Sequence, residues 1–432
     1  MDAFTVGCLS IAILFVIVLL GCPIGLAMTL VGFGGFAAIV GLSPALSVLQ
    51  TAAFETASNY SFTLIPLFLL MGNFVSQSGM ARDLFEGSAR LTRGWSGGLA
   101  AAGVTASAVF STVSGSSLAT ASTMTRVAYP EMEERGYDKR LAAGSLAAGG
   151  TLGIMIPPSI ALLLYALITE QSVGEMFLAG ILPGILAYLL YMVTIFIMAR
   201  IWIARPDADA INSHQGSRLS ALRLFSPAFG LFGLVMGGLY GGFFTPTEAG
   251  GAGAALALVY ALLRGLRWAG FVEALRETVR TTATIFIILI GAEVFGFVLS
   301  TSQLSFTMVD FLSQNDFSPN QVLLAILIFY VVLGCFMESL AMILLTVPIF
   351  YPIIIANGFD PVWFGVIAVV TVELGLISPP VGMNLFMVKS VAKDLPLKTI
   401  MTGVAPFVAV DILRLLILVA VPALSLFLPG RM

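Results

Sequence analysis

The chain has 432 residues, of which 59% are hydrophobic and only 10% are charged. This composition exceeds what the core of a soluble domain can bury, so it indicates an all-α polytopic membrane protein. The formal net charge is −3 and no basic stripe is interleaved with aromatic residues, which argues against nucleic-acid binding. The three cysteines lack metal-ligand spacing, and the single histidine lies in a polar stretch, so neither a zinc site nor an enzyme is expected.

Ten apolar segments have the length expected of membrane-spanning helices, in the order 5–20, 23–41, 61–79, 140–168, 177–200, 225–241, 246–263, 281–299, 362–388 and 402–428. The first has no positively charged start of the kind found in cleaved signal peptides, so we expect it to be a helix of the mature protein. Two further apolar stretches, 95–133 and 320–355, are too long for one simple span, and each has small or polar residues at its middle.

Charged residues indicate how these two stretches cross the membrane, because Lys and Arg collect in cytoplasmic loops. Basic residues stand on both sides of 95–133, namely Arg82, Arg90 and Arg93 before it and Arg135, Lys139 and Arg140 after it. The flanks of 320–355 hold Asp310, Asp316 and Asp360 but no Lys or Arg. We therefore predict two re-entrant helical hairpins, the first entering from the cytoplasmic side and the second from the periplasmic side, with a periplasmic N-terminus. The alternative is a pair of ordinary spans joined by an exposed turn.

Two parts of the chain repeat each other with an offset of 222 residues. The run Gly-Ile-Met-Ile-Pro-Pro at 153–158 recurs as Gly-Leu-Ile-Ser-Pro-Pro at 375–380, and Ser-Leu-Ala at 117–119 recurs at 339–341. We interpret this as an inverted structural repeat, in which each half contributes one hairpin and one broken helix, 140–168 or 362–388. The predicted units are a first half at 1–202, a cytoplasmic linker at 203–224 and a second half at 225–432.

The broken helix of the first half has the chemistry of a cation site. Pro157 and Pro158 remove two successive amide donors, and Gly153 lets nearby carbonyls turn sideways. Such backbone persists at membrane depth only where protein or a wet cavity supplies partners. With oxygens of Ser114 and Ser116 at the hairpin tip, these carbonyls would suit a small monovalent cation such as sodium.

The second half offers the same elements at its own break and tip. A second cation site would comprise Gly375, Ser378 and Pro380 with the tip residues Phe336 and Glu338. Because the N-termini of half-helices carry positive dipole ends, the space between the two tips favours an anionic substrate. The alternative is that each Pro-Pro pair only kinks a packed helix.

Polar side chains near the tips and breaks are candidates for a substrate chamber, namely Ser117, Thr120, Ser339, Thr371 and Asn384. Helix packing through small polar side chains explains them almost as well. Carboxylates at membrane depth are functional candidates, so Glu338 and Glu373 would shape the second ion site or the chamber.

Three other charged positions are expected to have structural roles. Glu293 is expected to be protonated or paired with a neighbouring helix, and Asp411 to pair with Arg414. Arg126 lies eleven residues beyond Gly115, about 16 Å along a helix, so we expect it to reach the cytoplasmic interface.

Three runs resemble a known family: FSTVSGSSLATASTMTR at 110–126, GTLGIMIPPSIALLLYA at 150–166 and ELGLISPPVGMN at 373–384. They are similar to the large membrane subunit of tripartite ATP-independent periplasmic (TRAP) transporters, and the similarity covers essentially the whole chain. The resemblance implies a scaffold domain and a mobile transport domain that contains both hairpins, in a sodium-driven elevator mechanism. It carries the first sodium site onto Ser114, Ser116, Gly153, Ile156 and Pro158.

The same resemblance implies partners and a location. These are a small four-helix membrane subunit, expected here as a separate polypeptide, a soluble periplasmic protein that delivers an organic acid, and the bacterial inner membrane. Sodium would be the coupling ion, and no other cofactor is expected. Sialic acids, C4-dicarboxylates, keto acids and ectoine-like solutes are all substrates compatible with the family resemblance. A self-sufficient sodium-coupled dicarboxylate carrier and a passive channel or scaffold are the alternative functions.

Overall fold

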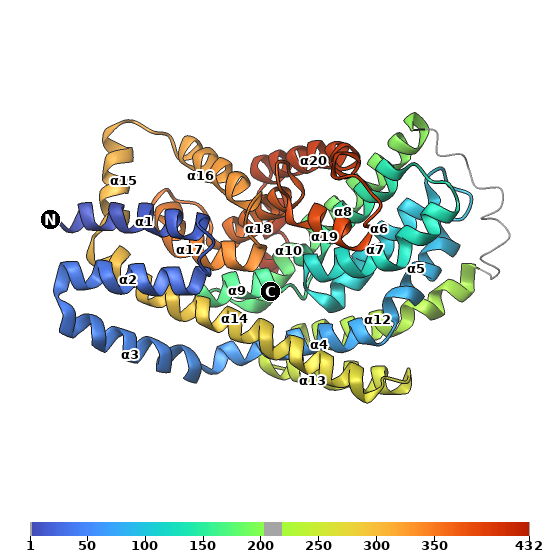
Figure 1. The fold of residues 1–432 in the computed structure, drawn as a ribbon, viewed down its shortest axis with the longest axis horizontal. Helices are drawn as coiled ribbons and strands as arrows, with labels where there is room; N and C mark the ends of the chain where they lie inside the picture. The colour runs from blue at the N-terminus through green and yellow to red at the C-terminus, as the bar shows by residue number, and fades with distance from the viewer. Residues whose placement is uncertain (1, 203–217, 432) are drawn as a thin grey trace.

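A computed structural model describes residues 2–202 and 218–431, and these residues form helices and loops without any β-strand (Figure 1). Eight helical segments are long and apolar enough to cross a membrane, namely Tyr60–Gln77, Lys139–Ile168, Val173–Ile201, Ser220–Tyr240, Pro246–Leu263, Trp268–Thr301, Ser339–Ala356 and Leu397–Ala420. The prediction of an all-α polytopic membrane protein is therefore confirmed.

The N-terminal part of the chain contains two helices that the apolar segments did not predict. Its elements are α1 (Ala3–Leu19), α2 (Ile24–Val40), α3 (Leu42–Ser58), the short η1 (Tyr60–Thr63), α4 (Leu64–Gln77) and α5 (Met80–Leu91). Helix α3 has polar residues along its length, and α5 is amphipathic with a buried apolar face. Neither shows the long apolar run by which a membrane span is identified.

The two long apolar stretches form helix pairs, as predicted. The first pair is α6 (Gly98–Ser114) with α7 (Ser117–Glu134), and the second is α16 (Pro319–Gly334) with α17 (Ser339–Ala356). Each predicted broken helix is also two helices, α8 (Lys139–Met155) with α9 (Ile160–Ile168), and α18 (Pro361–Ile377) with α19 (Met383–Val391). Both Pro-Pro peptide bonds in these breaks are cis.

The remaining helices complete the bundle. They are α10 (Val173–Ile201), α12 (Arg218–Tyr240), α13 (Pro246–Leu263), α14 (Trp268–Thr301), α15 (Leu304–Gln314), α20 (Leu397–Ala420), α21 (Ala423–Leu426) and η2 (Pro429–Arg431). Most of the predicted linker, 203–217, lies outside the described residues. Residues 218–224, which we predicted to belong to the linker, are the first residues of α12.

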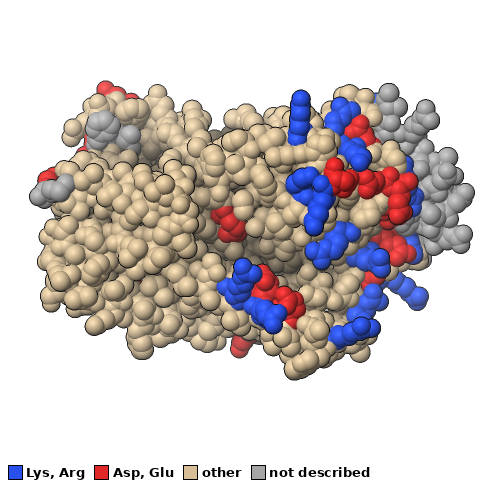
Figure 2. All heavy atoms as spheres, in the orientation of Figure 1, with Lys and Arg blue, Asp and Glu red and all other residues tan. Residues whose placement is uncertain are grey.

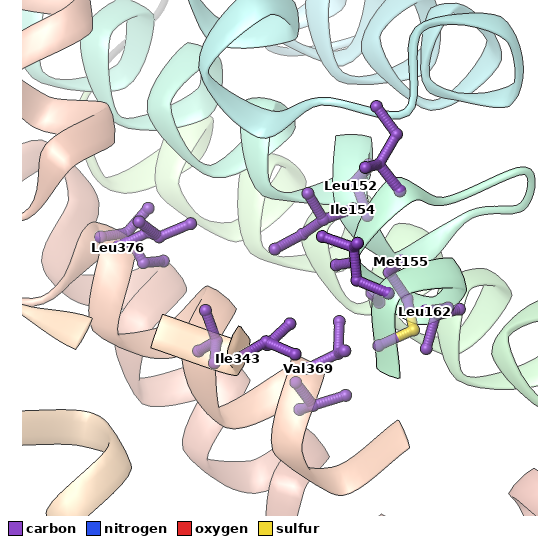
Figure 3. Packing of buried hydrophobic residues seen from close by; sticks show 14 of the residues in the cluster. Leu152, Ile154, Met155, Leu162, Ile343, Val369 and Leu376 are labelled. Atoms are coloured by element: carbon purple, nitrogen blue, oxygen red, sulfur yellow. The ribbon is translucent and has the colours of Figure 1, made fainter. Parts of the chain in front are cut away.

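The broken helices lie at the centre of the molecule. Every residue of α8 from Leu141 to Met155 is buried, as is every residue of α18 from Val362 to Ile377. Figure 3 shows side chains of α8, α9, α17 and α18 meeting in one apolar core. In contrast, α1, α2 and α13 expose large apolar residues, as expected for surfaces in contact with lipid.

Backbone contact through glycines fixes α8 against α20. A Cβ on Gly144 would overlap the carbonyl oxygen of Gly403, and a Cβ on Gly403 would overlap that of Arg140. Small residues at such a crossing let two membrane helices approach closely. Helices α8 and α20 therefore pack nearly backbone to backbone.

Basic residues are concentrated at one end of the molecule. On the face drawn in Figure 2, Lys and Arg gather at the end where α5 and α12 lie, and Figure 1 places the N-terminus at the opposite end. Contacts there join α7, α8 and the loop after α19: Lys139 Nζ lies 3.1 Å from Glu133 and 3.4 Å from Asp394. The Tyr129 hydroxyl donates to Asp394 at 2.9 Å, which lowers the pKa of that carboxyl.

Candidate functional site

The tip of the first hairpin is a sharp turn rich in oxygen atoms. Ser114 ends α6, Gly115 has a φ of +63°, and the extended Ser116 caps α7 by accepting the Ala119 amide at 3.4 Å. The left-handed conformation at Gly115 favours glycine, because a Cβ there is strained. The turn therefore favours glycine at position 115.

This tip lies directly against the break in α8. A Cβ on Gly153 would lie 2.5 Å from the Ser116 carbonyl oxygen and 2.9 Å from Thr120 Oγ1, so only glycine fits. The Ser114 and Thr120 hydroxyls are 2.9 Å apart. On the other side of the break, a Cβ on Gly115 would lie 3.1 Å from the Pro158 carbonyl oxygen. The structure thus brings together oxygen-bearing groups of the tip and the break, which the sequence placed about 40 residues apart.

Ile156 lies in the chain between the contacts made at Gly153 and at Pro158. Its backbone is extended, with φ −78° and ψ 120°, and it ends α8. Backbone and hydroxyl oxygens are hard ligands of the kind that small cations prefer. The predicted first site thus gathers hard oxygen donors, and Thr120, which we assigned to the substrate chamber, lies beside it with its hydroxyl 2.9 Å from that of Ser114.

The second tip is arranged differently. Gly375 packs against the helix end at Gly334, where a Cβ on Gly375 would lie 2.5 Å from the Gly334 Cα. The carboxylate of Glu338 turns back onto its own helix and accepts the amides of Leu340 and Ala341 at 3.1 and 3.2 Å. Because Glu338 stands where the first repeat has Ser116, its longer side chain caps α17 and leaves a different arrangement at this tip.

Other oxygens at the second break already have partners. Ser378 donates its hydroxyl to the Leu374 carbonyl at 2.6 Å, and Gly382 donates its amide to the Cys335 carbonyl at 3.0 Å. Phe336 and Pro380 are exposed. The five predicted residues of the second site are thus near one break but are less closely assembled than those of the first.

A cavity of about 610 Å³ opens beside both tips. Its walls come from α4, α6, α7 and α14, and from Glu338 and Leu340 of the second hairpin. Cavities of this size hold small organic molecules. Residues from both hairpins therefore meet one solute-sized space.

One face of α7 supplies polar groups to this cavity. Ala119, Ser122, Thr123 and Arg126 recur at the three- and four-residue spacing of a helix face, and all four line the cavity. The opposite walls carry amide and carboxylate side chains, namely Asn73, Gln77, Glu273 and Glu277. Arg126 is the one basic side chain among the described lining residues. We expected it at the cytoplasmic interface, and that expectation stays a prediction, since Arg126 is exposed as well as part of the cavity wall.

None of the five predicted chamber residues lines this cavity; Ser117, Thr120, Ser339, Thr371 and Asn384 lie outside its lining. The Asn384 amide donates to the Ser117 hydroxyl at 2.8 Å, and Thr371 donates to the Ile367 carbonyl at 2.7 Å. Ser339 donates to its neighbour Glu338 at 3.0 Å. On α7 the reason is helical geometry, because residues 117, 120 and 124 are buried on the face opposite the cavity.

The intramembrane carboxylates have defined partners. Glu373 accepts from Arg414 Nη2 at 2.6 Å, and Arg414 Nε lies 3.4 Å from Asp411, so the predicted Asp411–Arg414 pair is present. Glu293 accepts from Thr56 of α3 at 2.7 Å, which agrees with the expected pairing to a neighbouring helix. Glu373 does not line the cavity, whereas Glu338 does.

Comparison with known proteins identifies the family of this chain. Residues 11–424 match the family model described as tripartite ATP-independent periplasmic transporter, DctM component. The chain is 37% identical over 402 residues to the C4-dicarboxylate TRAP transporter large permease protein DctM of Pseudomonas aeruginosa, covering 92% of this chain and 93% of that protein. It is 34% identical over 380 residues to the sialic acid TRAP transporter large permease protein SiaM of Vibrio cholerae, covering 86% of each chain.

Solved structures of more distant proteins share the fold. The YdaH transporter of Alcanivorax borkumensis superposes with a TM-score of 0.64 at 16% identity, over 92% of this chain and 97% of that one. MtrF of Neisseria gonorrhoeae gives a TM-score of 0.56 at 13% identity, over 88% and 84%. The chain therefore belongs to the tripartite ATP-independent periplasmic transporter family, as a DctM component.

Proposed function

We propose that this chain couples sodium entry to the uptake of an organic acid, as the large subunit of a three-part system in the bacterial inner membrane. Relatives of this chain are named for C4-dicarboxylates, sialic acid and 2,3-diketo-L-gulonate. These names differ in the compound but agree in its class, so the proposal is limited to an organic acid.

The packing of the first hairpin tip against the α8 break carries the sodium proposal. Ser114, Ser116, Gly153, Ile156 and Pro158 would hold the ion through backbone and hydroxyl oxygens. No carboxylate is needed, which favours a weakly held monovalent cation that can be released in each cycle. Sodium would move down its gradient through the transporter as the coupling ion. Its binding at this tip would be the step that closes the first hairpin against the broken helix.

A second ion would bind at the other break, with Phe336, Glu338, Gly375, Ser378 and Pro380. The supporting observation is that both tips reach the same cavity. With one ion at each tip, two sodium-binding events would both affect the same cavity.

Arg126 is the cavity residue that would bind an anionic substrate, beside a lining that also carries Glu273, Glu277 and Glu338. Arginine pairs with a carboxylate through two parallel N–H groups, which fixes both position and orientation. Arg126 lies on the same helix face as Ser122 and Thr123, whose hydroxyls can bond the other oxygens of an acid. Glu273 and Glu277 on the opposite wall would disfavour a second anion.

The packing of helices supports an elevator movement. Helix α14 packs along α2 and α4, and α13 packs along α4, whereas α8 packs against α6, α7 and α20. We assign the stationary part to α2, α13 and α14, and the moving part to the two hairpins and the two broken helices. The cavity lies between α7 of the moving part and α14 of the stationary part, where such movement would expose it to either side.

Orientation and partners follow from the same reasoning. The basic end of the molecule would face the cytoplasm, and the N-terminus at the opposite end would then lie in the periplasm (Figures 1 and 2). Membership of the family supports a small four-helix membrane subunit and a soluble periplasmic binding protein as partners.

Uptake into proteoliposomes tests the proposal. The chain is reconstituted with its small subunit, and uptake of a labelled acid is measured with an inward sodium gradient or a potassium gradient, with and without the soluble protein. A TRAP subunit requires both sodium and the soluble protein. Uptake that needs sodium alone would instead identify a self-sufficient carrier, and uptake that needs neither would identify a channel.

A further inference from the structure

A buried polar network crosses the centre of the protein and joins both broken helices. It comprises Thr151 of α8, Tyr191 of α10, Glu373 of α18, and Asp411 and Arg414 of α20, and each of these residues is 0% exposed. Thr151 and Glu373 stand two positions before Gly153 and Gly375, the glycines of the two breaks. None of the five side chains lines the cavity, so the network is separate from the substrate space.

The charges of this network do not balance. Two carboxylates, Glu373 and Asp411, face a single guanidinium, Arg414. If both carboxylates were ionised, one negative charge would lie uncompensated in the protein core, which is strongly unfavourable. The only other titratable group recorded against either carboxyl within the described residues is the neutral Tyr191, and α8 contributes the uncharged Thr151.

The ion pair is unequally shared between the two carboxyls. Arg414 Nη2 donates to Glu373 Oε2 at 2.6 Å, whereas its Nε lies 3.4 Å from Asp411 Oδ1 without a hydrogen bond. The close contact of Asp411 is instead with the Tyr191 hydroxyl, 2.7 Å from Oδ2. Asp411 is therefore the carboxyl that lacks a full counter-charge.

The number of hydrogen atoms available in the network also indicates Asp411. Three contacts run in a chain: Asp411 Oδ2 to Tyr191 Oη at 2.7 Å, Tyr191 Oη to Thr151 Oγ1 at 3.0 Å, and Thr151 Oγ1 to the Ala148 carbonyl at 2.7 Å. Three hydrogen bonds need three hydrogens, but Tyr191 and Thr151 supply one each. Thr151 uses its own on Ala148, and Tyr191 can then satisfy either Thr151 or Asp411, but not both.

We propose that Asp411 binds one proton and donates it to the Tyr191 oxygen, which makes the centre of this transporter a proton-binding site separate from the proposed sodium sites. The chain of donors is then complete, from Asp411 to Tyr191 to Thr151 to the Ala148 carbonyl. The same proton cancels the surplus charge, so that Glu373 and Arg414 form a balanced pair.

A metal ion fits this place less well than a proton. Within this network the oxygens without a hydrogen bond are Glu373 Oε1 and Asp411 Oδ1, and a metal needs more oxygen ligands than two. Arg414 Nε and Nη1 also lack partners here, and their positive charge would repel a cation. A proton requires a single acceptor oxygen and no ligand shell.

Infrared spectroscopy of the purified chain in lipid nanodiscs at neutral pH tests this proposal directly. A protonated carboxyl has a C=O stretching band that an ionised carboxylate lacks. We expect such a band in the wild type, shifted when Asp side-chain carboxyls carry ¹³C and unshifted when Glu carboxyls do. Because the labelled wild type is measured, the result does not depend on whether any variant folds.

Variants assign the band to one residue. Asp411→Asn should lose it and keep the wild-type unfolding temperature, because the amide of asparagine donates to Tyr191 as the acid does. Asp83→Asn, at a carboxylate paired with Arg264 at 2.7 Å, should keep it. A band that Asp411→Asn leaves unchanged would place the proton on another carboxyl and overturn the proposal. Absence of the band, or its appearance only when sodium is removed, would also overturn it. None of these results depends on uptake, so failure here is distinct from failure of sodium coupling.

Discussion

Replacing Gly153 with alanine tests the first ion site with the smallest side chain that disturbs it. The new Cβ would lie 2.5 Å from the Ser116 carbonyl oxygen and 2.8 Å from its carbon, so the tip backbone has to move. Overpacking of this kind costs about 1–3 kcal/mol. If the cost falls on the ion-bound state, sodium affinity drops by roughly five- to 150-fold.

Thermal unfolding of the purified chain measures that loss without any partner. Sodium that binds only the native state raises the unfolding temperature, and a concentration of about 100 times Kd contributes about 2.7 kcal/mol. We expect the unfolding temperature of Gly153→Ala to fall in potassium, because the clash is present in the described packing, and the sodium titration to move to higher concentration in addition. A titration that coincides with the wild type would refute the assignment of this contact to an ion site.

Gly296→Ala is the matched control. Gly296 lies within α14, and a Cβ there meets no atom within 4 Å. The added methyl group should stabilise the helix by roughly 0.5–1 kcal/mol and leave the sodium titration in place. A shift of the same size in both variants would show that the effect belongs to glycine replacement in general.

The remaining predictions concern the tip, the cavity and the core. Ser116→Ala removes a helix cap and a tip oxygen, so it should cost about 1 kcal/mol in unfolding free energy and raise the sodium concentration for half-maximal uptake. Arg126→Gln should lower uptake about tenfold or more, as for loss of a charged hydrogen bond, and leave sodium-induced stabilisation intact; unchanged uptake would remove Arg126 from the substrate site. Gly144→Ala should lower the unfolding temperature, by about 1–3 kcal/mol in free energy, because its Cβ overlaps Gly403, whereas Gly230→Ala, which meets no atom within 4 Å, should not.

The ends of helices were predictable where small, polar or proline residues interrupt an apolar run. The small and polar residues at 114–116 and the Pro-Pro pairs at 157–158 and 379–380 mark helix ends that the structure shows. Helix α3 was missed because polar residues interrupt its apolar run, and α5 because only one face of this amphipathic helix is apolar and buried. The start of α12 at Arg218 was missed for a related reason, since its first turns carry polar residues resembling a linker.

The sequence predicted that the hairpin tip and the helix break would meet. It did not predict which side chains would contact each other. The approach of Gly153 to Ser116 agrees with the expected meeting of break and tip. The sequence could not show that Glu373 bonds Arg414, because the two residues are 41 positions apart on different helices. Proximity to the tip in the sequence also did not identify the residues of the cavity wall. Thr120 and Arg126 both lie on α7, but only the helix face that carries Arg126 lines the cavity.

Helix α14 has a consequence for how the protein is anchored. At 1.5 Å per residue its 34 residues extend about 51 Å, whereas the hydrocarbon layer is about 30 Å thick. Its first turns carry Glu273 and Arg276 in an exposed ion pair, so an overhang at this end would lie among headgroups and water, with Glu273 at the edge of the cavity. A lipid headgroup or a neighbouring subunit that binds this overhang would hold the helix at a fixed depth during the proposed movement of the cavity beside it.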